Sequence, residues 1–250
     1  MKRIAPRSTL TAVLLLISGT ALAAGAKVPL DQAQTDLGNM ASIQRGAALY
    51  VNYCQGCHSA EYMLYSRLAE DLELTEEQVE RNLILTGAKI GEPMVSTMDP
   101  ADATVWFGAP APDLSVIARS RGVDWLYTYL RSFYVDPNRP IGWNNTVLAN
   151  ASMPHVLWQL QGIQEPVFET QTDETGVSKE VLVDLKLATP GAQTEAEYDR
   201  TIRDLVTYLE YQSEPAKLKR ESMGVWVLLY LALFTFLAYL LKLEFWRDVH

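Results

Sequence analysis

The sequence predicts a mainly α-helical domain with long loops, one β-hairpin insertion and a single transmembrane helix at the C-terminal end. Capping boxes at Thr75 and Thr194 mark helix starts, and apolar residues recur at helical spacing after Thr194. Over 181–187, valine and leucine occupy alternate positions after a turn-forming segment at 173–176, which is typical of a hairpin. Residues 222–241 carry no charge. These patterns define the predicted fold class.

The helices of the domain follow from caps, breakers and apolar faces. Ser42 is expected to cap a helix over 43–53, and Asp124 a helix through Phe133. The capping boxes begin the other two, at 76–86 and at 195–211, and the last is expected to pack near the first. Residues 87–115 and 135–154 are expected to form irregular loops, and 166–187 the hairpin.

The two ends of the chain predict export and membrane anchoring. Residues 1–23 combine a basic start, a short apolar run and an Ala-Leu-Ala cleavage pattern, as a secretory signal peptide does. Residues 222–241 form a helix of roughly 30 Å, the thickness of a bilayer's hydrocarbon core. The expected organisation is an exported domain at 24–214, a linker at 215–221, the anchor, and a tail inside the cell at 242–250. An uncleaved N-terminal anchor and a buried core helix are the alternatives.

The composition narrows the classes of partner. The whole chain carries a net charge of −9, and the predicted signal peptide holds several of its cations, so the mature domain is more acidic still. Such a domain is not expected to bind nucleic acid or anionic lipid, whereas it can attract a basic protein. The acidic run at 70–80 serves either such docking or simply as a solvated helix face.

The pattern that carries chemistry is Cys54-Gln55-Gly56-Cys57-His58, which contains both cysteines of the chain. This is the attachment pattern for one covalent haem c. Two thiols at this spacing reach the two vinyl groups of one porphyrin and form thioethers. The adjacent histidine then supplies an imidazole nitrogen to the iron. His58 is therefore the expected proximal metal ligand.

Three other uses of these cysteines fit the sequence less well. A zinc site needs two more ligands at suitable spacing, and His155 and His250 are distant in the sequence. A redox-active pair belongs at a strand-to-helix turn of a βαβ unit, which the sequence does not indicate. A disulfide between Cys54 and Cys57 closes a short, strained loop. Covalent haem is the favoured interpretation.

The residues alone leave several candidates for the second axial ligand of the iron. A thioether ligand gives electron transfer at raised potential, whereas an open position gives catalysis or gas binding. Met153 lies in a polar, non-helical stretch with Pro154, where a loop can approach the open face of a haem. His155 remains an alternative ligand at this point. The full set of candidates is Met40, Met63, Met94, Met98, Met153 and His155.

The sequence resembles the cytochrome c1 family, the haem-bearing subunits of the bacterial bc1 complex (quinol–cytochrome c reductase). The resemblance rests on RGAALYVNYCQGCHSAEYMLYSRLAEDL, then APAPDLSVIARSR, a Met-Pro loop and the C-terminal span, in that order. It implies a class I cytochrome c domain in the periplasm, anchored in the bacterial inner membrane. It also implies that Met153 is the sixth ligand, that Arg121 reaches a haem propionate, and that Pro112 offers its carbonyl to the His58 ring.

The function expected from motif and resemblance is one-electron transfer. The resemblance implies an electron taken from a Rieske iron–sulfur protein and passed to a soluble or tethered cytochrome c, with cytochrome b in the same complex. No pattern indicates a general base or nucleophile, so the chain is not expected to be a catalyst alone. Two alternatives remain: a membrane-tethered monohaem cytochrome that donates to a terminal oxidase, and a haem enzyme or sensor with an open iron position.

Overall fold

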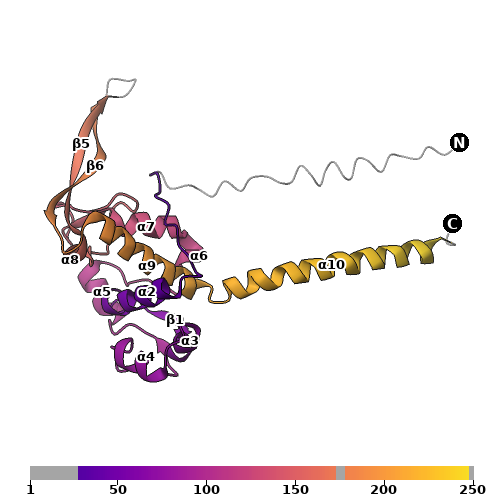
Figure 1. Ribbon diagram of the computed structural model, residues 1–250. Helices are drawn as coiled ribbons and strands as arrows, with labels where there is room; N and C mark the ends of the chain where they lie inside the picture. The colour runs from indigo at the N-terminus through magenta and orange to yellow at the C-terminus, as the bar shows by residue number, and fades with distance from the viewer. Residues whose placement is uncertain (1–27, 173–177, 248–250) are drawn as a thin grey trace.

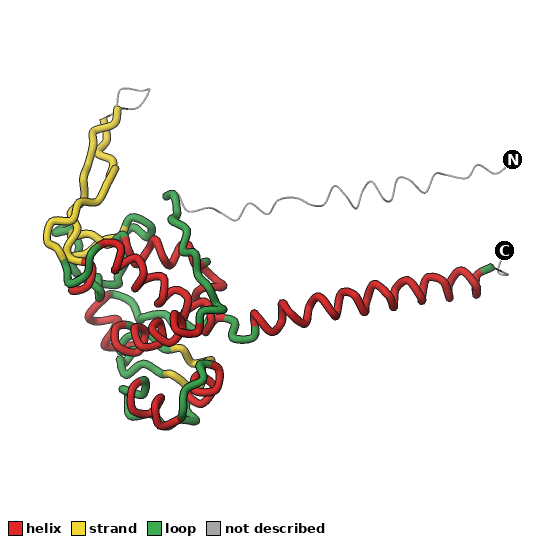
Figure 2. Tube along the Cα trace, viewed as in Figure 1, coloured by secondary structure: helices red, strands yellow, loops and turns green. Residues whose placement is uncertain are grey.

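The computed structural model describes residues 28–172 and 178–247. About half of these residues are helical, and one apolar helix stands at the C-terminal end, so the expected mainly α-helical architecture is confirmed at that level (Figure 1). In the described part of the chain, long loops and three two-stranded antiparallel sheets run between the helices (Figure 2). The predicted signal peptide at 1–23 and hairpin turn at 173–176 lie outside the described residues, as does the end of the predicted tail.

The centre of the domain is a pair of packed helices, α2 (Met40–Tyr53) and α9 (Glu195–Ser213). The apolar face expected on α2 is buried, and so is the face of α9. Gly46 is the point of closest approach, because a Cβ there would meet the Asp204 carbonyl and lie 2.6 Å from Cβ of Tyr208. The packing of first and last helix that the sequence predicts is confirmed.

Replacing Gly46 by alanine is expected to lower the free energy of unfolding by about 1–3 kcal/mol, because the added methyl overpacks the contact with α9. The measurement is urea unfolding of the full chain in detergent. Gly91→Ala is the control, since a Cβ at Gly91 meets no atom of the described chain within 4 Å. Equal stability of the two variants would show that α9 can move away without cost.

Two helix starts differ from the sequence prediction. Asn39, rather than Ser42, caps α2: its side chain accepts from the Ser42 N–H, at 3.1 Å. The Ser42 hydroxyl instead donates to Asp204 of α9, at 2.6 Å. At helix α7 (Val123–Arg131) the cap is Gly122, and the Asp124 carboxylate accepts from the Ala33 N–H, at 2.8 Å. In both cases the side chain that was expected to cap a helix forms a hydrogen bond with a residue far away in the sequence.

The capping box at Thr75 is present and begins α4 (Glu76–Asn82), which ends earlier than the predicted residue 86. Before it lie strand β1 (Ala60–Leu64) and helix α3 (Tyr65–Asp71). The predicted loop at 87–115 contains strand β2 (Pro93–Met94), which pairs with β1, and helix α5 (Pro100–Phe107). That loop is therefore more regular than expected, because Asp99 caps α5 and Pro100 occupies its first turn.

The middle of the chain surrounds α9 on its other side. Helix α6 (Ile117–Arg121) leads through Gly122, at φ +91°, directly into α7, and both helices pack on α9. Helix α7 ends at Arg131 rather than at the expected Phe133, and strand β3 (Phe133–Val135) follows it. This strand pairs with β4 (Trp143–Asn145), which lies inside the stretch expected to be irregular. The short helix α8 (Trp158–Gln161) leads to the hairpin.

The predicted hairpin is present and longer than 166–187. Strand β5 (Gly162–Thr172) pairs with β6 (Ser178–Pro190) in antiparallel register over their full length. Figure 1 shows it projecting from the helical body, away from the C-terminal helix. Helix α10 (Lys217–Trp246) also leaves the body, and it buries none of its residues. It begins inside the predicted linker at 215–221, so that segment is mostly helical. Its length and composition suffice to cross a membrane.

Candidate haem site

The cysteine motif forms a tight loop at the end of α2. Cys54 closes the helix with its N–H on the Tyr50 carbonyl, and the N–H groups of Cys57 and His58 return to the Cys54 carbonyl, at 3.0 and 2.8 Å. Both cysteines carry free thiols, with Cys54 buried and Cys57 half-buried. The loop therefore presents two thiols and an imidazole from one turn of chain, and the alternative disulfide is not formed.

Burial decides the protonation of these groups. It raises the pKa of Cys54 to about 12 and also raises the pKa of Cys57, so both are protonated near neutrality. Burial lowers the pKa of His58, which is therefore neutral. Among residues 28–172 and 178–247, no group of three or more His, Cys, Asp or Glu side chains lies together as a metal-binding cluster. A zinc site at these cysteines has no further ligands there.

An apolar cavity of about 290 Å³ opens beside the motif. Its walls come from the motif, the loop before α6, helices α6, α7 and α9, and the loop that follows β4. The six residues expected to attach, ligate or hold the haem all line it, namely Cys54, Cys57, His58, Pro112, Arg121 and Met153. Segments almost a hundred residues apart in sequence are thus brought to one hollow.

The His58 ring is fixed by the backbone of the opposite wall. Its Nδ1 lies 2.8 Å from the Pro112 carbonyl oxygen, as the resemblance implies. Because a carbonyl oxygen only accepts, Nδ1 carries the proton and Nε2 keeps the lone pair. The imidazole is thereby held in the tautomer that a metal ligand requires.

Met153 lines the cavity, and its sulfur accepts a hydrogen bond from the Tyr129 hydroxyl, at 3.5 Å. Burial raises the pKa of Tyr129, so this hydroxyl keeps its proton. The Tyr129 ring stacks on Trp125, with centroids 4.8 Å apart. Met98 is the other methionine on the cavity wall.

The remaining candidates for the sixth ligand point elsewhere. His155 is buried, stacked on Phe133 with ring centroids 5.1 Å apart, and set edge-on to Trp143. Burial lowers the pKa of His155 to about 4, so the ring is neutral. Met63 and Met94 belong to the hydrophobic core, and Met40 packs against it. None of these four residues lines the cavity, which leaves Met98 and Met153 as the methionines on its wall.

Arg121 lies at the cavity with its guanidinium over the Trp125 ring, 5.1 Å from the centroid. No carboxylate of the described residues forms a salt bridge with it. A cation on an apolar wall that no carboxylate of the described residues neutralises suits an anionic group of a ligand.

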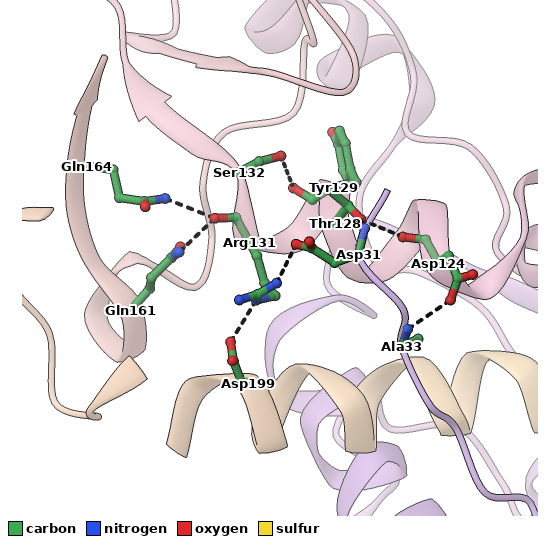
Figure 3. A network of polar contacts seen from close by, with 10 residues as sticks. All are labelled: Asp31, Ala33, Asp124, Thr128, Tyr129, Arg131, Ser132, Gln161, Gln164 and Asp199. Carbon is green, nitrogen blue, oxygen red and sulfur yellow. Dashed lines mark hydrogen bonds and ion pairs between the residues drawn. The ribbon is translucent and has the colours of Figure 1, made fainter. Parts of the chain in front are cut away.

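The wall helix α7 is held in place by a polar network around Arg131 (Figure 3). The Arg131 guanidinium binds Asp31 of the N-terminal segment and Asp199 of α9, both at 2.6 Å. Its carbonyl accepts from the side-chain amides of Gln161 and Gln164 at the base of the hairpin, at 2.8 and 2.9 Å. The helix that carries Trp125 and Tyr129 is therefore tied to three other parts of the chain.

The acidic run at 70–80 is partly engaged within the domain. Asp71 accepts from the Tyr211 hydroxyl at 2.8 Å and pairs with Arg67 at 3.0 Å. Glu77 faces Arg81 along α4, at 3.7 Å. Asp71 is thus part of the fold, whereas Glu76 and Glu80 remain exposed on the surface of α4.

The donor set and the cavity fit a c-type haem. Two free thiols, an imidazole with a free Nε2, a thioether and an arginine all border one apolar hollow. A c-type haem needs two thiols, a histidine ligand, an apolar surrounding and a cation for its propionates. Fold and site together therefore define the class of c-type cytochromes.

Comparisons with known proteins specify the family. The model of the cytochrome c1 family matches residues 34–249. Cytochrome c1 of Allochromatium vinosum is 45% identical over 98% of this chain and its own full length. A Nitrosomonas europaea protein named ammonia monooxygenase gamma subunit is also 45% identical, over 95% of this chain and 96% of its own. Cytochrome c1 of Rhodospirillum rubrum is 27% identical over 83% of this chain and 81% of its own. The chain belongs to the cytochrome c1 family.

Family membership confirms the resemblance read from the sequence, and it implies a haem c and haem-based electron transfer in the bc1 complex. With one apolar C-terminal helix, it also fits membrane anchoring. The sequence reasoning missed Trp125 and Tyr129 on the cavity wall. It also gave no role to Asp113 and Ser115, whose side chains accept from the N–H groups of Glu61 and Tyr62 just after the haem motif. Asp113 and Ser115 lie inside the APDLS stretch that carried the resemblance, so their place in that motif was the available signal.

Proposed function

We propose that this protein carries one covalent haem c in the cavity and transfers single electrons from a Rieske iron–sulfur protein to a soluble or tethered cytochrome c. The observation that carries the proposal is the convergence of Cys54, Cys57, His58 and Met153 on one apolar hollow. When bound, the haem supplies one-electron chemistry through its iron.

The protein's own residues attach, ligate and exclude water. Cys54 and Cys57 would form the thioethers, His58 would offer Nε2 to the iron, and Met153 would offer its sulfur. A thioether ligand and an apolar surrounding both raise the reduction potential. The hydrogen bond from Tyr129 orients the Met153 side chain.

Arg121 holds a propionate in this proposal. Its guanidinium lies at the cavity wall on Trp125 and has donors to offer in a fixed plane. The surrounding fold is a class I cytochrome c domain with the hairpin as an insertion.

The protein is proposed to work in the bacterial inner membrane beside cytochrome b. Residues 1–23 are removed as a signal peptide, the domain at 24–214 lies in the periplasm, and the chain crosses the membrane at 222–241 to a cytoplasmic tail. The uncharged span, which lies within α10, and the export signal in the sequence support this orientation. A tethered carrier for a terminal oxidase is the runner-up, because a C-terminal anchor suits it equally.

The experiment is purification of the full chain through a C-terminal tag in mild detergent, followed by a reduced-minus-oxidised spectrum. Membership of a bc1 complex predicts b-type haem bands beside the c-type band. A c-type band that stays alone under gentler extraction favours the tethered carrier. A protein without any c-type band contradicts the proposal itself.

A further inference from the structure

The segment Pro112–Ser115 lies along the backbone that follows the haem motif and is bonded to it at four points. The His58 ring nitrogen contacts the Pro112 carbonyl oxygen, at 2.8 Å. Two residues after Pro112, the Leu114 N–H donates to the Ser59 carbonyl, also at 2.8 Å. The two remaining contacts come from the side chains of Asp113 and Ser115.

Asp113 uses both of its carboxylate oxygens on backbone donors. Oδ2 accepts from the Glu61 N–H of β1 at 2.9 Å, and Oδ1 accepts from the Ser115 N–H at 2.7 Å. The carboxylate therefore bridges β1 to its own segment. Its bond to the Ser115 N–H closes a side-chain turn that begins at Asp113 itself, as aspartates do when they accept from the residue two positions on.

Ser115 provides the last contact and is buried in the domain. Its hydroxyl oxygen accepts from the Tyr62 N–H, at 3.1 Å. The far side of the segment is held by α9, since the Gln212 amide donates to the Leu114 carbonyl at 2.7 Å. The segment is thus fixed between β1 and α9, and the Pro112 carbonyl has little freedom to leave the His58 ring.

We propose that Asp113 and Ser115 are positioning residues that hold the Pro112 carbonyl against His58 and so set how strongly His58 donates electrons to iron. The inference rests on the proposed function, in which His58 is the proximal ligand. A histidine whose ring N–H is hydrogen-bonded is a more basic ligand. A more basic ligand favours ferric iron, so the clamp formed by residues 112–115 lowers the reduction potential.

The test is a redox titration of the haem-loaded full chain in detergent, with the EPR spectrum of the ferric form as a second readout. Ser115→Ala changes no charge and removes one contact of the clamp. We expect the ferrous-to-ferric ratio at fixed ambient potential to rise by roughly two- to ten-fold. A change of this size corresponds to the free energy of about one hydrogen bond. The ferric g-values should shift with it, because the imidazole donates less.

Asp113→Asn is the second variant, and Glu61→Gln is its matched control. Each substitution removes one negative charge from one of two residues joined by the Glu61 N–H bond to Asp113. The Glu61 side chain itself forms no hydrogen bond within the described part of the chain, and its backbone N–H is kept. The charge change alone raises the potential in both. If Asp113 holds the clamp, the reduction potential rises further in Asp113→Asn than in Glu61→Gln. Only Asp113→Asn should then show an EPR shift.

Wild-type potential and g-values in Ser115→Ala, together with equal behaviour of Asp113→Asn and Glu61→Gln, would overturn the inference. This outcome differs from failure of the proposed function. If the proposed function is wrong, the wild-type chain itself shows no low-spin haem spectrum with a histidine ligand.

Discussion

Replacing Met153 by leucine is expected to abolish the sulfur-to-iron charge-transfer band of the oxidised protein and to lower its reduction potential. Leucine keeps the apolar wall of the cavity but has no atom that can bind iron. Loss of a thioether ligand removes a main cause of high potential in c-type cytochromes. The reduced variant should also bind carbon monoxide, because an axial position becomes open. Near-infrared absorption, redox titration and carbon monoxide difference spectra measure these three effects.

Met98→Leu is the matched control, since Met98 is the other methionine on the cavity wall. It makes the same chemical change in the same hollow and should leave the band in place. A band that survives in Met153→Leu and disappears in Met98→Leu would move the ligand to Met98. Carbon monoxide binding by the unaltered protein would instead favour the haem enzyme or sensor.

Replacing both Cys54 and Cys57 by serine is expected to remove covalent haem completely. Each thiol adds across one vinyl double bond, the sulfur bonding to carbon and the proton passing to the neighbouring carbon. Serine hydroxyls do not form such thioethers. Each single variant should keep haem on the remaining cysteine. Haem staining after denaturing electrophoresis measures the attachment, with an antibody against the C-terminal tag to correct for chain abundance.

His58 separates attachment from ligation in the same assay. His58→Ala keeps both thiols, so we expect haem to stay attached to the chains that have received it. The low-spin spectrum of those chains should be lost. Stained haem in the double cysteine variant would contradict thioether attachment at this motif.

Local signals predicted much of the fold. The capping boxes at Thr75 and Thr194 and the alternation that ends near Leu187 depend on neighbours in sequence, and the structure contains all three elements. The predictions that Ser42 and Asp124 cap helices were wrong, because both side chains bond to distant parts of the chain. Their partners are an aspartate of α9 and the N-terminal segment, which no local pattern reveals.

The site shows the same division. The thiols and His58 are adjacent in sequence, so their shared use is readable from spacing alone. Spacing could not decide between Met153 and His155 as the second ligand, because both lie on one loop. Burial separates their positions: His155 packs between aromatic rings, and Met153 borders the cavity. The support from Tyr129 and Asp113 needed tertiary contacts.

The most direct test of the central claim is the intact mass of the purified protein under denaturing conditions. The expected mass is that of residues 24–250 plus one haem, because a single motif attaches a single group and the signal peptide is removed. The bare chain mass would contradict covalent haem. A mass with haem that still includes residues 1–23 would contradict cleavage of the signal peptide and leave the haem site intact.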